Sequence, residues 1–79
     1  MFLIASDIVI NMDNVSATFI NDDGHLQLEV SNGAFTLGNI PDNALQQIAV
    51  AVAECKPFLE MENARIVEET SNDFGTDIE

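Results

Sequence analysis

The chain has 79 residues, of which 47% are apolar, a length that suits one small domain with a single core. Fourteen acidic residues against two basic ones give a net charge of −12. A surface of this charge repels nucleic acid phosphates and anionic membranes, and the lack of Trp and Tyr removes most side chains that stack on bases. Composition therefore excludes direct binding of nucleic acid or of a membrane surface.

The cellular compartment is indicated by cysteine usage and by hydropathy. Cys55 is the one cysteine, so no disulfide can form within the chain, and a single buried thiol is typical of a reducing cytoplasm. No apolar run approaches the roughly 20 residues that cross a bilayer, and the first residues lack the basic start of a signal peptide. We therefore expect a cytoplasmic protein.

The first twenty residues favour strands. Residues 2–5 and 8–10 are β-prone and are separated by Ser6-Asp7, so they predict either one interrupted strand or the two halves of a tight hairpin. Turn formers follow at 11–14. Residues 15–20 then alternate between apolar and polar side chains, which predicts a half-buried strand with its odd-numbered residues facing the core.

Two turns divide the next stretch into hairpins. Residues 21–24 combine Asx residues with a glycine that supplies positive φ, and Asn32-Gly33 is a strong hairpin signal. Residues 25–30 and 34–37 alternate in the same way as the strand before them. The three strands predict an antiparallel meander with one face in water.

The segment Ile40–Cys55 predicts the one clear helix. Pro41 suits the first turn, because its fixed φ and missing N–H are compatible with a helix start. Asn43 can form a capping box with the glutamine three residues on, and Asn39 or Asp42 can serve as the cap instead. The proline at 57 stops the helix, because the residue before a proline avoids the α region.

The middle of this helix is apolar on nearly every side, whereas a surface helix normally has one apolar stripe. Leu45, Ile48 and Val52 share the stripe that we expect to pack on the sheet. Three other positions are left without a partner inside the chain and are candidates for self-association: Val50, Ala51 and Ala53.

Residues 58–67 allow two interpretations, a pair of strands around a turn at Glu62-Asn63 or a helix, and the strands are favoured. Residues 68–79 carry five acids and no base, which predicts a flexible tail. The predicted organisation is one α+β domain over 1–67, an antiparallel meander of four to five strands with one helix packed on it, followed by the acidic tail. The predicted core consists of Phe19, Leu26, Leu28, Val30, Phe35, Leu37, Leu45, Ile48 and Val52.

No cluster of side chains predicts catalysis or metal binding. His25 lies on the outward side of its strand, whereas a general base needs a pocket and an orienting group. Cys55 follows a helix C-terminus, where the dipole disfavours a thiolate, and is interpreted as a structural residue. Asp22-Asp23 fits a hairpin turn, since a Ca²⁺ loop alternates its ligands over about 12 residues. We expect no enzyme, no metal and no cofactor.

The acidic residues indicate a function through the negative electrostatic field that they create together, rather than as ligands of a metal. Carboxylates held on a rigid surface can stand in for nucleic acid phosphates and occupy a basic groove. The alternative is that the acids only keep the protein soluble. The candidates for binding a basic partner are eight acids: Asp22, Asp23, Glu29, Glu54, Glu60, Glu62, Glu68 and Glu69.

A resemblance bears on the kind of partner. The stretch IVINMDNV (residues 8–15), followed by an alternating hairpin and a single helix, resembles a pattern in small phage and prophage proteins over residues 8–55. Short acidic inhibitors of host defence, anti-CRISPR proteins among them, share it. The resemblance implies a protein that occupies a surface of a larger, often nucleic-acid-binding, host complex in the host cytoplasm.

The expected function is therefore that of a non-enzymatic interaction protein, which binds and blocks a basic surface of a larger protein or complex. The alternative is a self-associating structural or assembly subunit, a homodimer that uses the apolar surface of the helix. Salt dependence of partner binding separates the first function from the second, which predicts a larger mass in solution.

Overall fold

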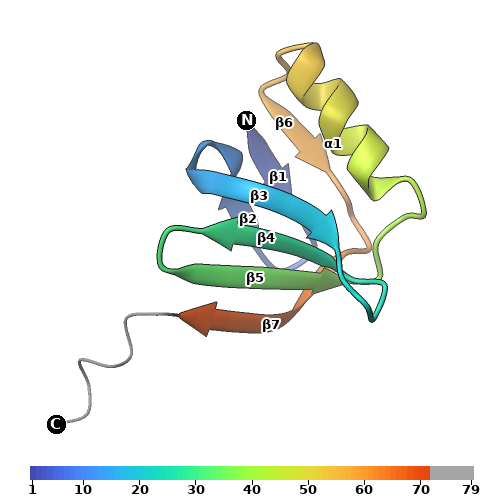
Figure 1. The fold of residues 1–79 in the computed structure, drawn as a ribbon. Helices are drawn as coiled ribbons and strands as arrows, with labels where there is room; N and C mark the ends of the chain where they lie inside the picture. Colours follow the sequence, from blue (N-terminus) through green and yellow to red (C-terminus); the bar gives the residue numbers. More distant parts are fainter. Residues whose placement is uncertain (72–79) are drawn as a thin grey trace, which may run out of the picture.

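The computed structural model describes residues 1–71 of the chain and has an α+β fold (Figure 1), which confirms the predicted class. Seven strands, one α-helix and one 3₁₀ helix lie within these residues. In chain order the elements are β1 (Phe2–Ile4), β2 (Val9–Asn11), η1 (Met12–Asn14), β3 (Val15–Ile20), β4 (Leu26–Val30), β5 (Gly33–Gly38), α1 (Ala44–Ala53), β6 (Phe58–Glu60) and β7 (Arg65–Ser71).

The strands form two sheets, one of them antiparallel with four strands, whereas the sequence predicted one antiparallel meander of four to five strands and missed the second sheet. The larger sheet is antiparallel, with the order β3-β4-β5-β7, and contains the predicted three-stranded meander. The smaller sheet has the order β2-β1-β6. In it β1 and β2 form an antiparallel hairpin, the second of the two predicted alternatives, with Leu3 opposite Ile10, and β1 pairs in parallel with β6.

The core lies between the two sheets, and α1 covers it on one side by contacting β3 and β6 (Figure 1). Four leucines are fully buried, Leu3 from the smaller sheet and Leu26, Leu28 and Leu37 from the larger one. Three of these four were predicted; so was Ile48, which α1 contributes. The sequence pattern missed the remaining buried apolar residues, which are Leu3, Ala5, Ile10, Ala44, Ala51, Met61 and Ala64.

Strand β3 faces the other way from the prediction over most of its length. Residues opposite one another on adjacent strands share a face of the sheet, and Phe19 lies opposite Gln27 while Thr18 lies opposite the buried Leu28. The register shifts directly after Val15, and an irregularity of this kind turns the following residues over. Phe19 therefore lies on the outer face, 39% exposed, and its place in the predicted core is wrong.

Helix α1 is shorter than predicted at both ends and begins without the expected capping box. Asn43 occupies the N-cap, but its side chain accepts no hydrogen bond from the helix backbone. Its Oδ1 instead accepts from Nε2 of Gln47 at 2.8 Å. Asp42 and Asn43 form a turn before the helix, which the N–H of Ala44 closes by donating to the carbonyl of Pro41 at 3.1 Å.

The buried stripe of α1 is also different from the predicted one. Ala44, Ile48 and Ala51 are its buried residues, at the spacing of four and three that aligns side chains along one face. Leu45 is 36% exposed and Val52 is 59% exposed, so their predicted core positions are wrong. Two alanines in the contact let α1 lie close to the sheets, because the distance between packed elements depends on the side chains between them.

The C-terminus of α1 ends in a Schellman motif. The N–H of Cys55 donates to the carbonyl of Val52 at 3.1 Å, and the N–H of Lys56 donates to that of Ala51 at 2.9 Å. The motif requires a left-handed residue at Cys55, whose φ is 54°. Glycine is the usual residue there, since a side chain in this conformation is strained. Cys55 is exposed rather than buried, which corrects the prediction of a buried thiol.

Replacing Cys55 by glycine is expected to stabilise the protein by about 1 kcal/mol, because glycine adopts the left-handed conformation without the strain that a side chain causes. For a domain of this size the melting temperature should rise by about 4–8 °C. Cys55→Ala keeps the strained side chain and removes only the thiol, so it is the matched control and should change little. A thermal melt followed by circular dichroism measures both; equal melting temperatures for the two variants would contradict the prediction.

The last part of the described chain confirms the strand interpretation of residues 58–67, with a turn at Glu62-Asn63 between β6 and β7. Strand β7 continues to Ser71, so the predicted tail does not begin at Glu68. The pairing with β5 accounts for this, because Glu68 lies opposite Thr36 in the ladder. The rest of the predicted tail, 72–79, lies outside the described residues.

Candidate interaction surface

The groups considered for chemistry in the sequence are His25, Cys55 and the pair Asp22-Asp23. The His25 ring lies over the backbone of Gly38, 3.5 Å from where a Cβ of that residue would be. Within residues 1–71 no three His, Cys, Asp or Glu side chains are placed to hold a metal ion. In the same part of the chain, no helix has the length and hydrophobicity to span a membrane.

Asp22 and Asp23 form the tip of the turn between β3 and β4, and both are exposed. Asn21 fixes this turn, because its Oδ1 accepts from the N–H of Asp23 and from the N–H of His25, both at 3.0 Å. Asx side chains stabilise turns in this way. Gly24 completes the turn with a φ of 79°. The two carboxylates are thus presented to solvent on a well-defined turn.

The three acids of the larger sheet do not belong to one patch. Glu29 lies opposite Ala34 and Glu68 lies opposite Thr36, so both project from the outer face, away from the core. Glu69 is the next residue of β7 and projects from the other face. These acids are separated from those near the helix, so the eight candidates form at least two distinct groups.

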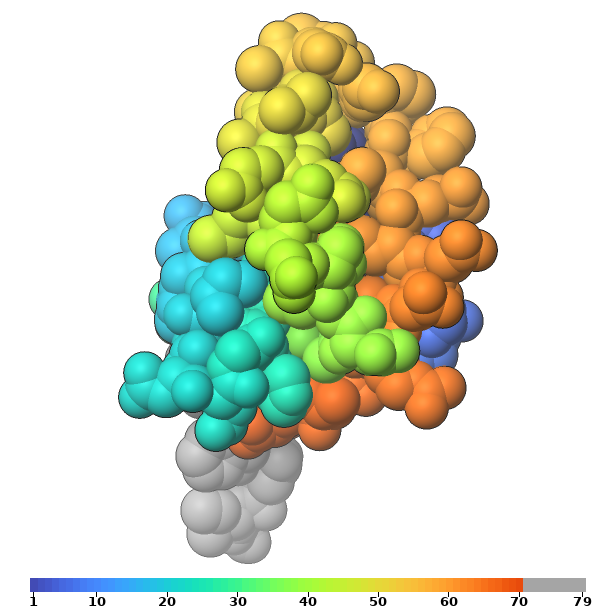
Figure 2. Space-filling view, turned by 90° about the vertical axis from the view of Figure 1, so that its right-hand side faces the viewer, coloured from blue at the N-terminus to red at the C-terminus, as the bar shows by residue number. Residues whose placement is uncertain are grey.

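The remaining candidates flank α1. Glu54 directly follows the helix, and its Oε1 lies 3.6 Å from Nζ of Lys56. Glu60 ends β6 and Glu62 lies in the following turn, both exposed. Figure 2 shows α1 in the middle of one face of the molecule, with the β3–β4 segment on one side of it and the β6–β7 segment on the other. This face therefore carries acids on both sides of the helix.

Of the three residues proposed for self-association, two are exposed and one is buried. Val50 is 51% exposed and Ala53 is exposed, so both lie on the solvent side of α1. Ala51 is 1% exposed and belongs to the core, which corrects its assignment to an accessible surface. Leu45 and Val52 take its place on the exposed side. No signal in the sequence separated the buried face from the exposed one, because Ala49 and Ala53 share a face of the helix just as Ala44 and Ala51 do.

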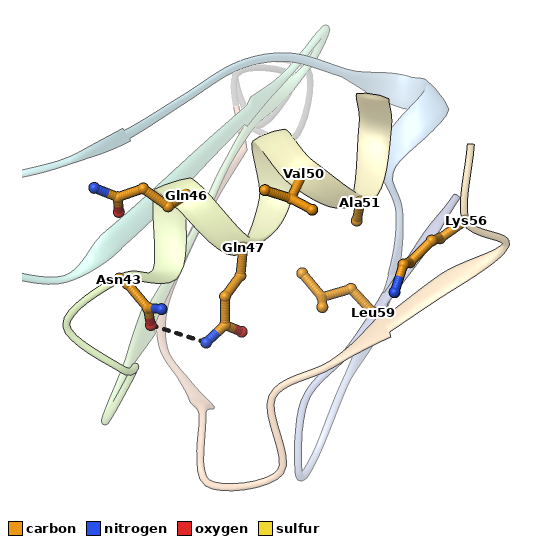
Figure 3. Close-up of a pocket in the computed structure, with 7 residues that line it drawn as sticks. All are labelled: Asn43, Gln46, Gln47, Val50, Ala51, Lys56 and Leu59. Carbon is orange, nitrogen blue, oxygen red and sulfur yellow. Dashed lines mark hydrogen bonds between the residues drawn. The ribbon is translucent and has the colours of Figure 1, made fainter. Parts of the chain in front are cut away.

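A shallow hollow of about 300 Å³ lies between α1 and β6 (Figure 3). Val50 and Leu59 line it from the helix and from the strand, and Lys56 stands at one end. The hydrogen-bonded pair Asn43 and Gln47 lies at the other end. The hollow is large enough to receive an apolar side chain of a partner beside the exposed helix face.

Comparison of the chain with protein-family models, with curated proteins and with solved structures found no match in any of the three.

Proposed function

We propose that the chain is a non-enzymatic interaction protein, which binds a basic surface of a larger cytoplasmic protein or complex and blocks it. A nucleic-acid-binding partner is proposed, because such proteins concentrate Lys and Arg on one face. The resemblance to small phage inhibitors of host defence agrees with this kind of partner. In that case the carboxylates occupy positions that phosphates otherwise take.

The observation that carries the proposal is the lack of internal compensation for the acids. In the part of the chain that the structure describes, ion pairs form at two carboxylates, Asp13 with the N-terminal amine at 3.4 Å and Glu54 with Lys56 at 3.6 Å. Both are exposed, and exposed pairs contribute little to stability. The other carboxylates of residues 1–71 form no ion pair with the cations of that part of the chain, and a basic protein surface supplies a counter-charge.

The proposal predicts a steep salt dependence of partner binding. The Debye length falls from about 10 Å at 0.1 M salt to about 3 Å at 1 M, so interactions between charges on the two proteins are screened. We expect the affinity for the partner to fall by at least about tenfold over this range. The partner is captured on the immobilised full chain from a lysate of its source at low salt and identified by mass spectrometry; its affinity is then measured by calorimetry.

The matched variants test whether charge or shape is recognised. Glu60→Gln with Glu62→Gln removes two charges next to α1, whereas Glu60→Asp with Glu62→Asp keeps them. We expect the first pair to weaken binding by about tenfold at 0.1 M salt and the second to have a small effect. An affinity that neither salt nor the glutamine pair changes would rule out the proposed function.

A second function, self-association, is favoured by one observation, the exposure of Val50 and Val52, at 51% and 59%. A contiguous exposed apolar patch commonly marks an interface. Val50 and Val52 lie on opposite edges of the exposed side of α1, so an interface that uses both spans the width of the helix. Sedimentation analysis of the full chain over a wide concentration range tests this function. A monomer at all concentrations would contradict it.

A further inference from the structure

We propose that the solvent face of α1 is the centre of the docking surface, and that its occupant is a protein with an apolar patch flanked by Lys and Arg. This inference rests on the proposed function. It adds the location of the binding surface on α1 and a hydrophobic contact beside the electrostatic one. The acids around the helix orient the partner, and the helix face makes the contact that excludes water. Three features of the described residues support it: the composition of the helix, the hollow beside it and the acids around it.

The exposed side of α1 is uncharged and mostly apolar, with Gln46 as its exposed polar residue. The helix sequence ALQQIAVAVA contains no charged residue, although acids are the most frequent charged residues of the chain. Leu45, Val50 and Val52 are 36%, 51% and 59% exposed. The exposed side of a helix is ordinarily polar, because nothing is gained by placing apolar groups in water. Val50 borders the hollow on the β6 side of the helix, whereas Val52, about 200° around the helix axis from it, shares the opposite edge with Leu45. A partner that spans both edges buries all three side chains, which supplies the hydrophobic part of a binding free energy.

The hollow beside α1 extends the same surface toward β6. Its wall includes the side chains of Val50 and Leu59, and the exposed Lys56 stands at its end (Figure 3). Interfaces are commonly anchored by one apolar or aromatic side chain that enters such a hollow. An anchor placed there would also cover Val50. The hollow therefore continues the exposed side of the helix at the edge that carries Val50.

Acids surround this contact area. The β3–β4 segment, with Asp22 and Asp23 at its turn, lies on one side of α1, and the segment with Glu60 and Glu62 lies on the other (Figure 2). Glu54 stands at the C-terminal end, where it pairs with Lys56. An apolar centre with a charged rim is the usual construction of a protein interface.

The negative charge of the acids around the helix distinguishes two possible partners, a second copy of the chain and a basic protein. A second copy of the chain would bring an equally acidic rim, at a net charge of −12 per chain, against this one. Like charges brought together across an interface oppose binding, whereas Lys and Arg around a matching apolar patch favour it. The surface therefore suits a basic partner better than a copy of itself.

Two synthetic peptides serve as probes of this chemistry. The first is an amphipathic helix of about 14 residues made of Leu and Lys, and the second has Ser in place of Leu, with the same number of Lys residues. Titrations of the isotope-labelled full chain are followed by NMR. We expect the leucine peptide to bind at least about tenfold more tightly at equal salt, with its largest amide shifts in residues 44–53.

Acidic substitutions on the helix distinguish docking on α1 from charge attraction alone, because the two predict opposite changes in affinity for the leucine peptide. Val50→Asp with Val52→Asp makes the chain more acidic, so charge attraction alone would leave the binding of both peptides unchanged or stronger. Docking on the helix face predicts at least about tenfold weaker binding of the leucine peptide only. Val9→Asp on β2 and Val67→Asp on β7, at positions 60% and 50% exposed, add the same charge away from the helix and should not weaken this binding. Thermal melts establish that each variant is folded.

The outcomes distinguish the inference from the proposed function. Equal binding of both peptides, with shifts away from residues 44–53, overturns the docking surface and leaves the proposed function standing. Binding of neither peptide, or binding that salt does not weaken, contradicts both. A free chain that dimerises, and that Val50→Asp with Val52→Asp makes monomeric, identifies a second copy as the occupant and overturns the inference.

Discussion

A chain carrying Ile48→Asp is expected to be largely unfolded at 25 °C. Ile48 is 7% exposed and packs in the core from the middle of the buried face of α1. The substitution removes a buried apolar side chain and places an unpaired carboxylate in the same site, which together cost about 4 kcal/mol or more. A small domain has about 5–15 kcal/mol of stability in total, and a domain of this size is at the low end.

The matched variant is Val52→Asp, which introduces the same side chain one turn later in the same helix. Val52 is 59% exposed, so its aspartate remains in water and the protein should stay folded. Urea titration followed by circular dichroism measures both variants. The assignment of the buried face would be refuted if Val52→Asp proved as damaging as Ile48→Asp.

Truncation of Leu28 to alanine is expected to lower the free energy of unfolding by about 2–5 kcal/mol. Leu28 is 0% exposed and lies on β4, an interior strand of the larger sheet, opposite Thr18 on one side and Phe35 on the other. The loss combines the hydrophobic transfer of the side chain with the cavity that neighbouring strands cannot close. The corresponding fall in melting temperature is about 4–8 °C per kcal/mol.

Leu45→Ala provides the comparison for this prediction. The same atoms are removed from α1, where Leu45 is 36% exposed, and helix propensity favours alanine slightly. A loss below about 1 kcal/mol is expected. Differential scanning calorimetry of the two variants compares them directly, and a loss at Leu45 as large as that at Leu28 would show that the sequence-based core was right.

The central part of the fold could be predicted from the sequence because its signals are local. Alternation of apolar and polar side chains located β3, β4 and β5, and the turns at Gly24 and at Asn32-Gly33 separated them. The same alternation assigned Leu26, Leu28 and Leu37 correctly to the core. Periodicity and turn formation depend on residues that are close together in the chain, so both can be recognised from one sequence.

Which side of α1 and which side of β3 pack against the core could not be predicted in the same way. A helix that is apolar all round has no polar side to mark the solvent, so Leu45 and Val52 were as plausible in the core as Ala44 and Ala51. On β3, a register shift reverses the faces without any change in composition, which placed Phe19 outside. Both errors concern residues whose position is set by distant partners.

The sequence predicted that the candidate surface is acidic, but it did not predict how the acids are grouped in space. The eight acids identified from sequence are where solvent can reach them, with Glu29 half-buried, but Glu29 and Glu68 project from the sheet face while Glu60 and Glu62 stand beside α1. Net charge is a property of composition and needs no fold. The grouping of acids around an apolar helix depends on which elements the two sheets bring together.

The parallel pairing of β1 with β6 has a consequence for how the chain folds during its synthesis. β3, β4 and β5 need only short loops to pair, whereas Phe2 meets Phe58 only after nearly the whole domain has been made. Until then one edge of β1 presents unpaired N–H and C=O groups, and Leu3 lacks part of its cover. The interval between emergence of β2 and emergence of β6 is therefore the period in which the nascent chain is most exposed to mispairing with its neighbours.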